Sequence, residues 1–217
     1  MAATDFSYAC QLKLADKPCL LVGGGLVALR KAKKLLAAKA LITIIAPSLQ
    51  QELVLWHQAK KIIWHQRCFA PGDTKDYFLV IAATNNAAVN AAVAREALAE
   101  KALVNVTDNP ALGNFSVPSS LQKGALTFTI ATGGMPALTK ALKEDLSAYY
   151  NEAFLEFTAF LLEQRPQVKN LLPTAQKRQA FWQALLNPEL LALVHKGKAD
   201  LAKERILHAI AGLRTQS

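Results

Sequence analysis

The sequence predicts an α/β protein with a Rossmann-like order of elements: a parallel-sheet domain, then a small β-rich segment, then a helical C-terminal domain. Short apolar runs alternate with helical patterns over residues 1–112, which is typical of strands joined by crossover helices. A period-two pattern opens residues 113–147, and only helical periodicity is present in residues 148–217. We therefore expect domains with these boundaries.

The elements of the first domain follow from apolar runs between turn-forming residues. Residues 6–14 alternate loosely between polar and apolar and predict a short strand ahead of the sheet. Ser48 suits the N-cap of a helix over residues 49–59, and another helix is expected over residues 87–100. Strands of the parallel sheet are expected at residues 19–22, 41–46, 62–65, 77–83 and 103–106.

The second segment reads as a hairpin. Residues 115–119 and 126–132 have period two and flank the sequence Gln122-Lys123-Gly124. A two-stranded ribbon is marginal alone, so we expect its apolar face to be buried against a second copy of the chain in a homodimer.

The C-terminal part is helical. Pro136 suits the first turn of a helix, and an apolar stripe continues to Leu161. We therefore expect one long helix that ends before Pro166. Further helices are expected at residues 174–186, 188–195 and 198–213.

The composition limits the class of protein. The chain has 217 residues, 52% of them hydrophobic, so it can bury a sizeable core. Its net charge of +9 suggests an anionic partner, but the basic residues lack the aromatic interleaving of a nucleic-acid surface. Neither a signal peptide nor an 18-residue apolar span is found, and the scattered cysteines (Cys10, Cys19, Cys68) fit a reducing compartment. We expect a cytoplasmic protein without nucleic acid, membrane or resident metal.

The strongest motif is a glycine turn between the first strand and the first helix. Gly23, Gly25 and Ala28 form G-x-G-x-x-A, followed by an apolar helical face. In this context the glycines permit a tight turn and a close approach of backbone to a pyrophosphate. A tight turn without a ligand is the alternative.

The nucleotide is not fixed by this motif. The second strand ends at Ala46-Pro47-Ser48, without the acidic residue that usually binds the ribose 2′-hydroxyl. Arg30, Lys31 and Lys33 could be taken as ligands of a 2′-phosphate, but a charge run on a helix is typical of a solvated face.

Several motifs in order resemble the siroheme synthase N-terminal module over residues 5–150. They are LVGGGLVALRKAKKLL, VIAATNN, LVNVTDNP, NFSVPSS and TIATGGMPALTKAL. The resemblance implies that NAD accepts a hydride from the tetrapyrrole precorrin-2, which becomes sirohydrochlorin. Bifunctional members then insert Fe²⁺, and dehydrogenase-only members share the same motifs.

The resemblance also implies site residues. Asp108 would serve both reactions, although an Asx turn is the alternative for an aspartate before Asn-Pro. The loop at Thr132 would suit a propionate of the substrate, although a plain strand-to-helix turn is equally consistent. The expected cofactor-binding residues are Gly23, Gly25, Leu26, Val27, Pro47, Ser48 and Thr84. The expected substrate-binding residues are Asn105, Asn114, Thr132, Gly133 and Gly134.

The sequence departs from the family pattern in two places. Leu29 stands where an acidic residue is expected, and the TGGMP loop is one residue shorter than usual. No methyltransferase module follows, so we do not expect this chain alone to make precorrin-2. A non-catalytic NAD-sensing regulatory domain is the competing hypothesis, and it would need neither Asp108 nor the glycine-rich loop.

Overall fold

The computed structural model describes residues 8–214. The chain divides into two compact units between Val117 and Pro118. Each unit has its own core, and each is described by itself.

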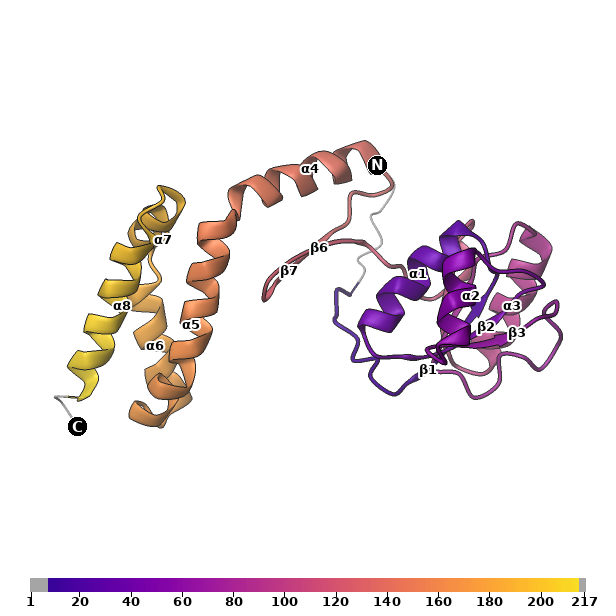
Figure 1. Ribbon diagram of the computed structural model, residues 1–217, viewed down its shortest axis with the longest axis horizontal. Coiled ribbons are helices and arrows are strands. Elements are labelled where there is room, and N and C mark those ends of the chain that lie inside the picture. Colours follow the sequence, from indigo (N-terminus) through magenta and orange to yellow (C-terminus); the bar gives the residue numbers. More distant parts are fainter. Residues whose placement is uncertain (1–7, 215–217) are drawn as a thin grey trace. The chain divides into compact units, whose positions relative to one another are not determined.

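The first unit is built on a five-stranded parallel sheet (Figure 1). Its strands are β1 (Pro18–Val22), β2 (Leu41–Ile45), β3 (Ile63–His65), β4 (Leu79–Ala82) and β5 (Leu103–Val106), in the order β3-β2-β1-β4-β5. Val22 is in register with Ile45 on one side and Ala82 on the other, so these strands end together. The strand order reverses between β1 and β4, which is where sheets of this kind bind ligands.

Helices cover both faces of this sheet, which explains why its central strands are continuous apolar runs. Helices α1 (Leu26–Ala37) and α2 (Gln51–Gln58) pack on one face, in the core that includes Leu21 and Ile44. Helix α3 (Ala87–Ala99) packs on the other face, with Leu20 and Val80. A short 3₁₀ helix, η1 (Pro110–Leu112), follows β5.

Two predictions for this unit are wrong. Residues 8–14 form no strand, while residues 6 and 7 lie outside the described part. Ser48 does not cap α2, which begins at Gln51 after Gln50 and has no side-chain cap. The chain is diverted there because the Gln50 N–H donates to the Gly24 carbonyl at 2.9 Å.

The second unit begins with an antiparallel hairpin, β6 (Ser119–Lys123) and β7 (Leu126–Ile130). The predicted first strand at residues 115–119 is wrong, because Phe115 instead packs on the core of the first unit and its N–H donates to Val104 O. Helix α4 (Pro136–Tyr149) contacts the hairpin. The Lys123 ammonium donates to the Ser147 and Tyr150 carbonyls at the end of this helix, at 2.6 and 3.0 Å.

The rest of this unit is a helical bundle. Its helices are α5 (Glu152–Leu171), α6 (Ala175–Leu185), α7 (Pro188–His195) and α8 (Ala199–Arg214), packed around Phe157, Val194 and Ile206. The single long helix predicted from the apolar stripe is wrong. The chain breaks at Asn151, whose side chain caps α5 by accepting from Phe154 N–H, and Pro166 lies inside α5. No helix within residues 8–214 is long and apolar enough to cross a membrane.

Candidate dinucleotide-binding site

A cavity of about 520 Å³ opens at the carboxyl ends of β1, β2 and β4, where the strand order reverses. It is lined by residues 22–25, 45–50, 68–69, 83–86 and Val89. Among the described residues that line it, none carries a charge. The wall is therefore formed by glycine backbone, polar uncharged side chains and apolar side chains.

The three glycines of the turn differ in whether the protein leaves room for a larger residue. Gly23 has a φ of 122°, and a Cβ there would collide with the backbone of Ala83. A Cβ on Gly24 would collide with the Ser48 carbonyl. A Cβ on Gly25 would meet nothing within 4 Å. Gly23 and Gly24 are thus required by packing, whereas Gly25 leaves open space in the cavity wall, as a backbone that approaches a pyrophosphate requires.

The start of α1 is available to an anion. Gly25 is the N-cap residue, and no side chain accepts a hydrogen bond from the first turn. The first turn contains no acidic residue. Free N–H groups and the partial positive charge of a helix start favour a phosphate at this place.

The predicted cofactor residues are only partly gathered in the cavity. Pro47, Ser48 and Thr84 line it together with Gly23 and Gly25. By contrast, the first two residues of α1 do not line it, and their side chains are 72% and 38% exposed (Leu26 and Val27, respectively). Their expected role in cofactor binding stays a prediction.

Thr84 is held in place by a buried residue that the sequence did not single out. Asn90 is fully buried in α3, and its Oδ1 accepts from Thr84 N and Thr84 Oγ1, at 3.1 and 2.7 Å. Its Nδ2 donates back to the Thr84 carbonyl at 3.1 Å. Three hydrogen bonds therefore anchor the segment after β4 where it borders the cavity.

The predicted substrate residues after β5 have their amides engaged within the protein. Asn105 is 5% exposed; it accepts from Lys31 Nζ at 3.0 Å and donates to Phe115 O at 3.2 Å. Burial and the nearby charges of Arg30 and Lys34 lower the pKa of Lys31.

Asn114 is engaged in a similar way. It accepts from Val104 N and donates to Ala102 O, at 2.7 and 2.9 Å, and so covers the free edge of β5. These bonds give both asparagines a structural role, and substrate binding by either one stays a prediction.

Asp108 is exposed at the same edge of the sheet, two residues beyond β5. Within residues 8–214 its carboxylate makes no hydrogen bond or ion pair. The Asx turn considered as an alternative is therefore not formed. The carboxylate is therefore exposed and without a partner among the described residues, at the edge of the sheet where the cavity opens.

Thr132, Gly133 and Gly134 belong to the second unit. The Thr132 hydroxyl lies 2.6 Å from Thr139 Oγ1 and donates to Met135 O at 2.9 Å, which closes the turn into α4. Both glycines have positive φ, 59° and 91°, and a Cβ on either would meet open space. Conformation rather than crowding thus favours glycine here, and binding of a propionate by this loop stays a prediction.

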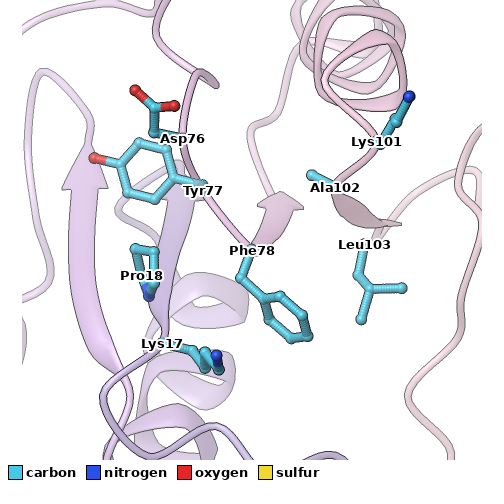
Figure 2. A pocket seen from close by; sticks show the side chains of 8 residues that line it. All are labelled: Lys17, Pro18, Asp76, Tyr77, Phe78, Lys101, Ala102 and Leu103. Carbon is cyan, nitrogen blue, oxygen red and sulfur yellow. The ribbon is translucent and has the colours of Figure 1, made fainter.

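A second hollow, of about 620 Å³, lies at the opposite, amino-terminal edge of the sheet (Figure 2). Lys17, Phe78 and Leu103 border it, and the Lys17 ammonium lies 5.7 Å from the Phe78 ring centroid. Because parallel sheets bind ligands at their carboxyl edge, we assign no role in the reaction to this hollow.

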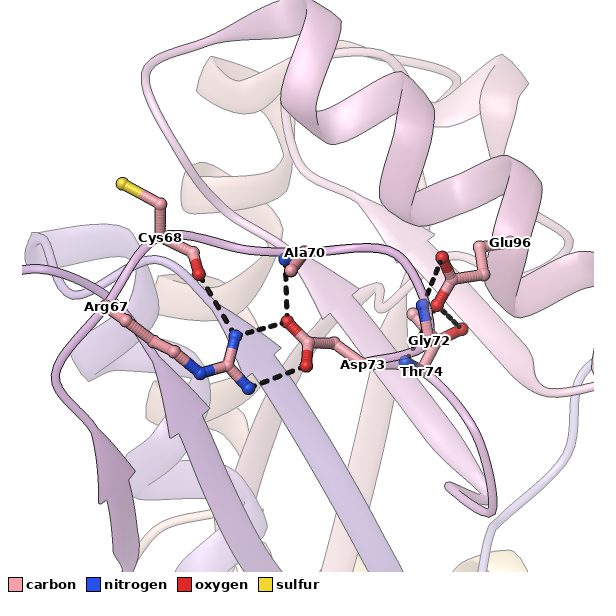
Figure 3. Close-up of polar contacts among 7 residues, drawn as sticks. All are labelled: Arg67, Cys68, Ala70, Gly72, Asp73, Thr74 and Glu96. Carbon is pink, nitrogen blue, oxygen red and sulfur yellow. Dashed lines mark hydrogen bonds and ion pairs between the residues drawn. The ribbon is translucent and has the colours of Figure 1, made fainter.

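No sequence motif predicted that Cys68 and Phe69 form part of the cavity wall. These residues follow β3 in a loop that is held by hydrogen bonds to two carboxylates (Figure 3). Asp73 accepts from both terminal nitrogens of Arg67, at 2.6 Å each. Glu96 of α3 accepts from Gly72 N, Thr74 N and Thr74 Oγ1, at 3.0, 3.0 and 2.7 Å.

These bonds also shift the acidities of the loop. The hydrogen bond from Arg67 holds the pKa of Asp73 below its usual range. Burial raises the pKa of Glu96, but the hydrogen bonds from Thr74 and Gly72 outweigh burial and hold it lower. Both carboxylates are therefore ionised at neutral pH and stabilise the loop. Among the described residues no cluster of three or more His, Cys, Asp or Glu side chains could hold a metal ion.

The fold and the cavity are those of a Rossmann-type dinucleotide-binding protein. A family model described as "Putative NAD(P)-binding" matches residues 10–119, and a model for the "Sirohaem synthase dimerisation region" matches residues 156–210. The chain belongs to the family of siroheme synthase N-terminal modules.

Proteins with similar sequences support this family assignment. The chain is 34% identical over 202 residues to a siroheme synthase of Methylobacillus flagellatus and 34% identical over 200 residues to one of Xylella fastidiosa. These matches cover 93% and 91% of this chain but 43% and 42% of the relatives, so the chain spans less than half of their length. Among solved structures, "SirC, precorrin-2 dehydrogenase" matches with a TM-score of 0.77 and 28% identity, covering 93% of this chain and 100% of SirC.

Proposed function

We propose that this protein oxidises precorrin-2 to sirohydrochlorin with NAD as the hydride acceptor. The observation that carries the proposal is the unpaired carboxylate of Asp108 at the edge of the sheet that also forms the dinucleotide cavity. The match with SirC extends over the whole of that protein and supports the same substrate class.

The cavity fits the cofactor in two respects. Gly25 leaves room where the pyrophosphate would approach the backbone, and the uncapped start of α1 would bind its charge. The uncharged lining supports NAD rather than NADP, because it offers no cation to a 2′-phosphate. When bound, the nicotinamide ring would accept the hydride.

The step that the side chains of this protein must perform is the removal of a proton from the substrate. Oxidation of precorrin-2 removes a hydride and a proton from the macrocycle, so a base must take the proton. Asp108 has no internal partner that would compete for it. In this proposal Asp108 accepts the proton, and Asn90 keeps Thr84 rigid beneath the bound cofactor.

A direct test supplies precorrin-2 and NAD to the purified protein without oxygen. We expect the absorbance of sirohydrochlorin to appear together with an equimolar amount of NADH. Tight NAD binding without turnover of precorrin-2 would refute the proposal and favour the regulatory alternative, which the comparisons do not support.

Iron insertion is a further proposal for the same site. Insertion of Fe²⁺ requires removal of pyrrole protons, and the exposed carboxylate of Asp108 suits that step as well. Adding Fe²⁺ after the oxidation should then produce the spectrum of siroheme, more slowly in a variant that lacks this carboxylate. Formation of siroheme at no more than the uncatalysed rate would show that the protein is a dehydrogenase only.

We further propose that the protein is a cytoplasmic homodimer, without nucleic acid or membrane among its partners. The match to a dimerisation region supports a dimer, as do exposed apolar residues such as Leu138, Leu142 and Tyr149 on α4. The free cysteines fit a reducing compartment. A monodisperse monomer at micromolar concentration in light scattering would count against the dimer.

A further inference from the structure

The wall after β3 lies where the ribose of the adenosine half is expected. Strand β3 pairs with β2, and Ala46 N–H donates to His65 O at 3.3 Å just where both strands end. Cys68 and Phe69 therefore line the same cavity as Pro47 and Ser48. In dinucleotide-binding folds the group that distinguishes a 2′-hydroxyl from a 2′-phosphate stands at the end of the second strand.

Arg67 is the one charged residue directly adjacent in sequence to the described residues that line the cavity. An arginine near this place is the usual partner of a 2′-phosphate, because its fork matches phosphate oxygens. Taken alone, Arg67 would therefore predict NADP.

The guanidinium is nevertheless already engaged. Its two terminal nitrogens each donate to Asp73 at 2.6 Å, and one of them also donates to the Cys68 carbonyl at 3.1 Å (Figure 3). A bidentate pair with a carboxylate uses the same fork that a phosphate would need. The ion pair with Asp73 therefore neutralises the positive charge of Arg67.

Asp73 is itself fixed by the loop. Its Oδ2 accepts from Ala70 N–H at 2.7 Å, and its side chain is only 13% exposed. The following residue, Thr74, is fully buried and bonded to Glu96. The carboxylate cannot swing away from Arg67 without disturbing these contacts, so a phosphate would have to compete with a preorganised partner.

We propose that Asp73 is a specificity-determining residue that makes this protein prefer NAD to NADP by holding the guanidinium of Arg67. The inference rests on the proposed function in one respect, that a nicotinamide dinucleotide occupies the cavity. A 2′-phosphate then meets either an uncharged wall or an arginine already paired, whereas the 2′-hydroxyl of NAD needs neither.

The test measures dissociation constants of NAD and NADP by calorimetry for the wild type and for Asp73→Asn. Asparagine keeps the shape and can still accept from Ala70 N–H, but it leaves the charge of Arg67 unpaired. We expect the wild type to bind NAD more tightly, and the ratio of the NADP to the NAD constant to fall about tenfold in the variant, mainly through tighter NADP binding.

Further variants separate specificity from a merely structural role. Adding Arg67→Gln to Asp73→Asn should restore the wild-type ratio, since no guanidinium is left to bind the phosphate. Asp73→Ser removes the same charge and serves if the asparagine variant does not fold. Glu144→Gln is the matched control: it removes the carboxylate of an ion pair within α4, with Lys140 at 3.8 Å, and should leave the ratio within about twofold.

The outcomes distinguish this inference from the proposed function. A wild type that binds neither nucleotide overturns both. A wild type that binds NAD and NADP equally, or an Asp73→Asn variant that weakens both by the same factor, overturns the role of Asp73 and leaves the proposed dehydrogenase standing.

Discussion

Two glycines of the turn after β1 allow the effect of a substitution on folding to be separated from its effect on dinucleotide binding. At Gly23 the backbone has a φ of 122°, and a Cβ would meet backbone atoms of Ala83 that cannot move aside. At Gly25 the φ is −81° and the space is open. We therefore expect Gly23→Ala to destabilise the first unit, and Gly25→Val to fold but lose the dinucleotide.

The magnitudes follow from these geometries. Positive φ costs an L-residue about 1–2 kcal/mol, and overpacking against rigid backbone adds about 1–3 kcal/mol, so Gly23→Ala should lower the free energy of unfolding by roughly 2–5 kcal/mol. That is a large share of the roughly 5–15 kcal/mol typical of a protein. At Gly25 the conformation is open to any residue, and the change at an N-cap should stay within about 1 kcal/mol.

Binding should respond in the opposite order. A side chain on Gly25 occupies the place where the backbone would meet the pyrophosphate and removes charge-assisted hydrogen bonds worth about 3 kcal/mol, a factor of roughly 10² in the dissociation constant for NAD. Circular dichroism during urea unfolding gives stability, and calorimetry gives affinity. A Gly25→Val variant that binds NAD tightly, or a Gly23→Ala variant as stable as the wild type, would refute the reasoning.

The remaining predictions concern titratable and reactive groups. Asp108→Asn should leave folding and NAD affinity nearly intact while turnover of precorrin-2 falls about 10²–10⁴-fold; loss of NAD binding instead would make Asp108 a cofactor residue. Folding lowers the pKa of Asp73 and that of Glu96. Their ionised forms therefore stabilise the protein at pH values above the unfolded-state pKa near 4, and this stabilisation is lost as the pH falls through the folded-state pKa. Thermal unfolding at decreasing pH should show this loss for the wild type and less of it for Glu96→Gln. Burial raises the pKa of Cys19 to about 11, so a thiol reagent at pH 8 should modify Cys10 and Cys68 but not Cys19, and NAD should slow only Cys68; equal rates with and without NAD would contradict the placement of Cys68 in the cavity wall.

The strands and helices of the parallel sheet could be predicted because each is specified by its own residues. Cys19 is fully buried in β1, as its apolar run indicated, and Gly23 opens the turn into α1. Pro136 begins α4, where its missing N–H costs nothing.

The elements that were predicted wrongly depend on contacts that hydrophobic periodicity does not reveal. The period-two pattern continues through Phe115, but that residue packs on the first core and leaves the hairpin to begin at Ser119. The apolar stripe runs unbroken past residue 150, whereas the chain breaks at the capping side chain of Asn151. In both places tertiary contact or a single cap outweighs the periodicity.

In the site, too, features set by local motifs could be predicted and features set by contacts between separate segments could not. The glycines and Thr84 are placed by local motifs, whereas the pairing of Arg67 with Asp73 requires a loop to fold back on itself, and Asn90 reaches Thr84 from within a helix. A charged residue near a predicted nucleotide site therefore cannot be assigned to a ligand until its internal partners are known. Arg67 and Lys31 are both cations near this site, and both are engaged by side chains of the protein.

Unlike Arg67 and Lys31, Asp108 has no hydrogen-bond or ion-pair partner among the described residues. A carboxylate that accepts no hydrogen bond from the described residues and pairs with no cation adds nothing to the stability of the loop after β5. An asparagine or serine at this position would suit the turn before Pro110 equally well. The proposed role as a base does not depend on any contact that holds this loop, so Asp108→Asn should change turnover of precorrin-2 and leave the unfolding midpoint where it is.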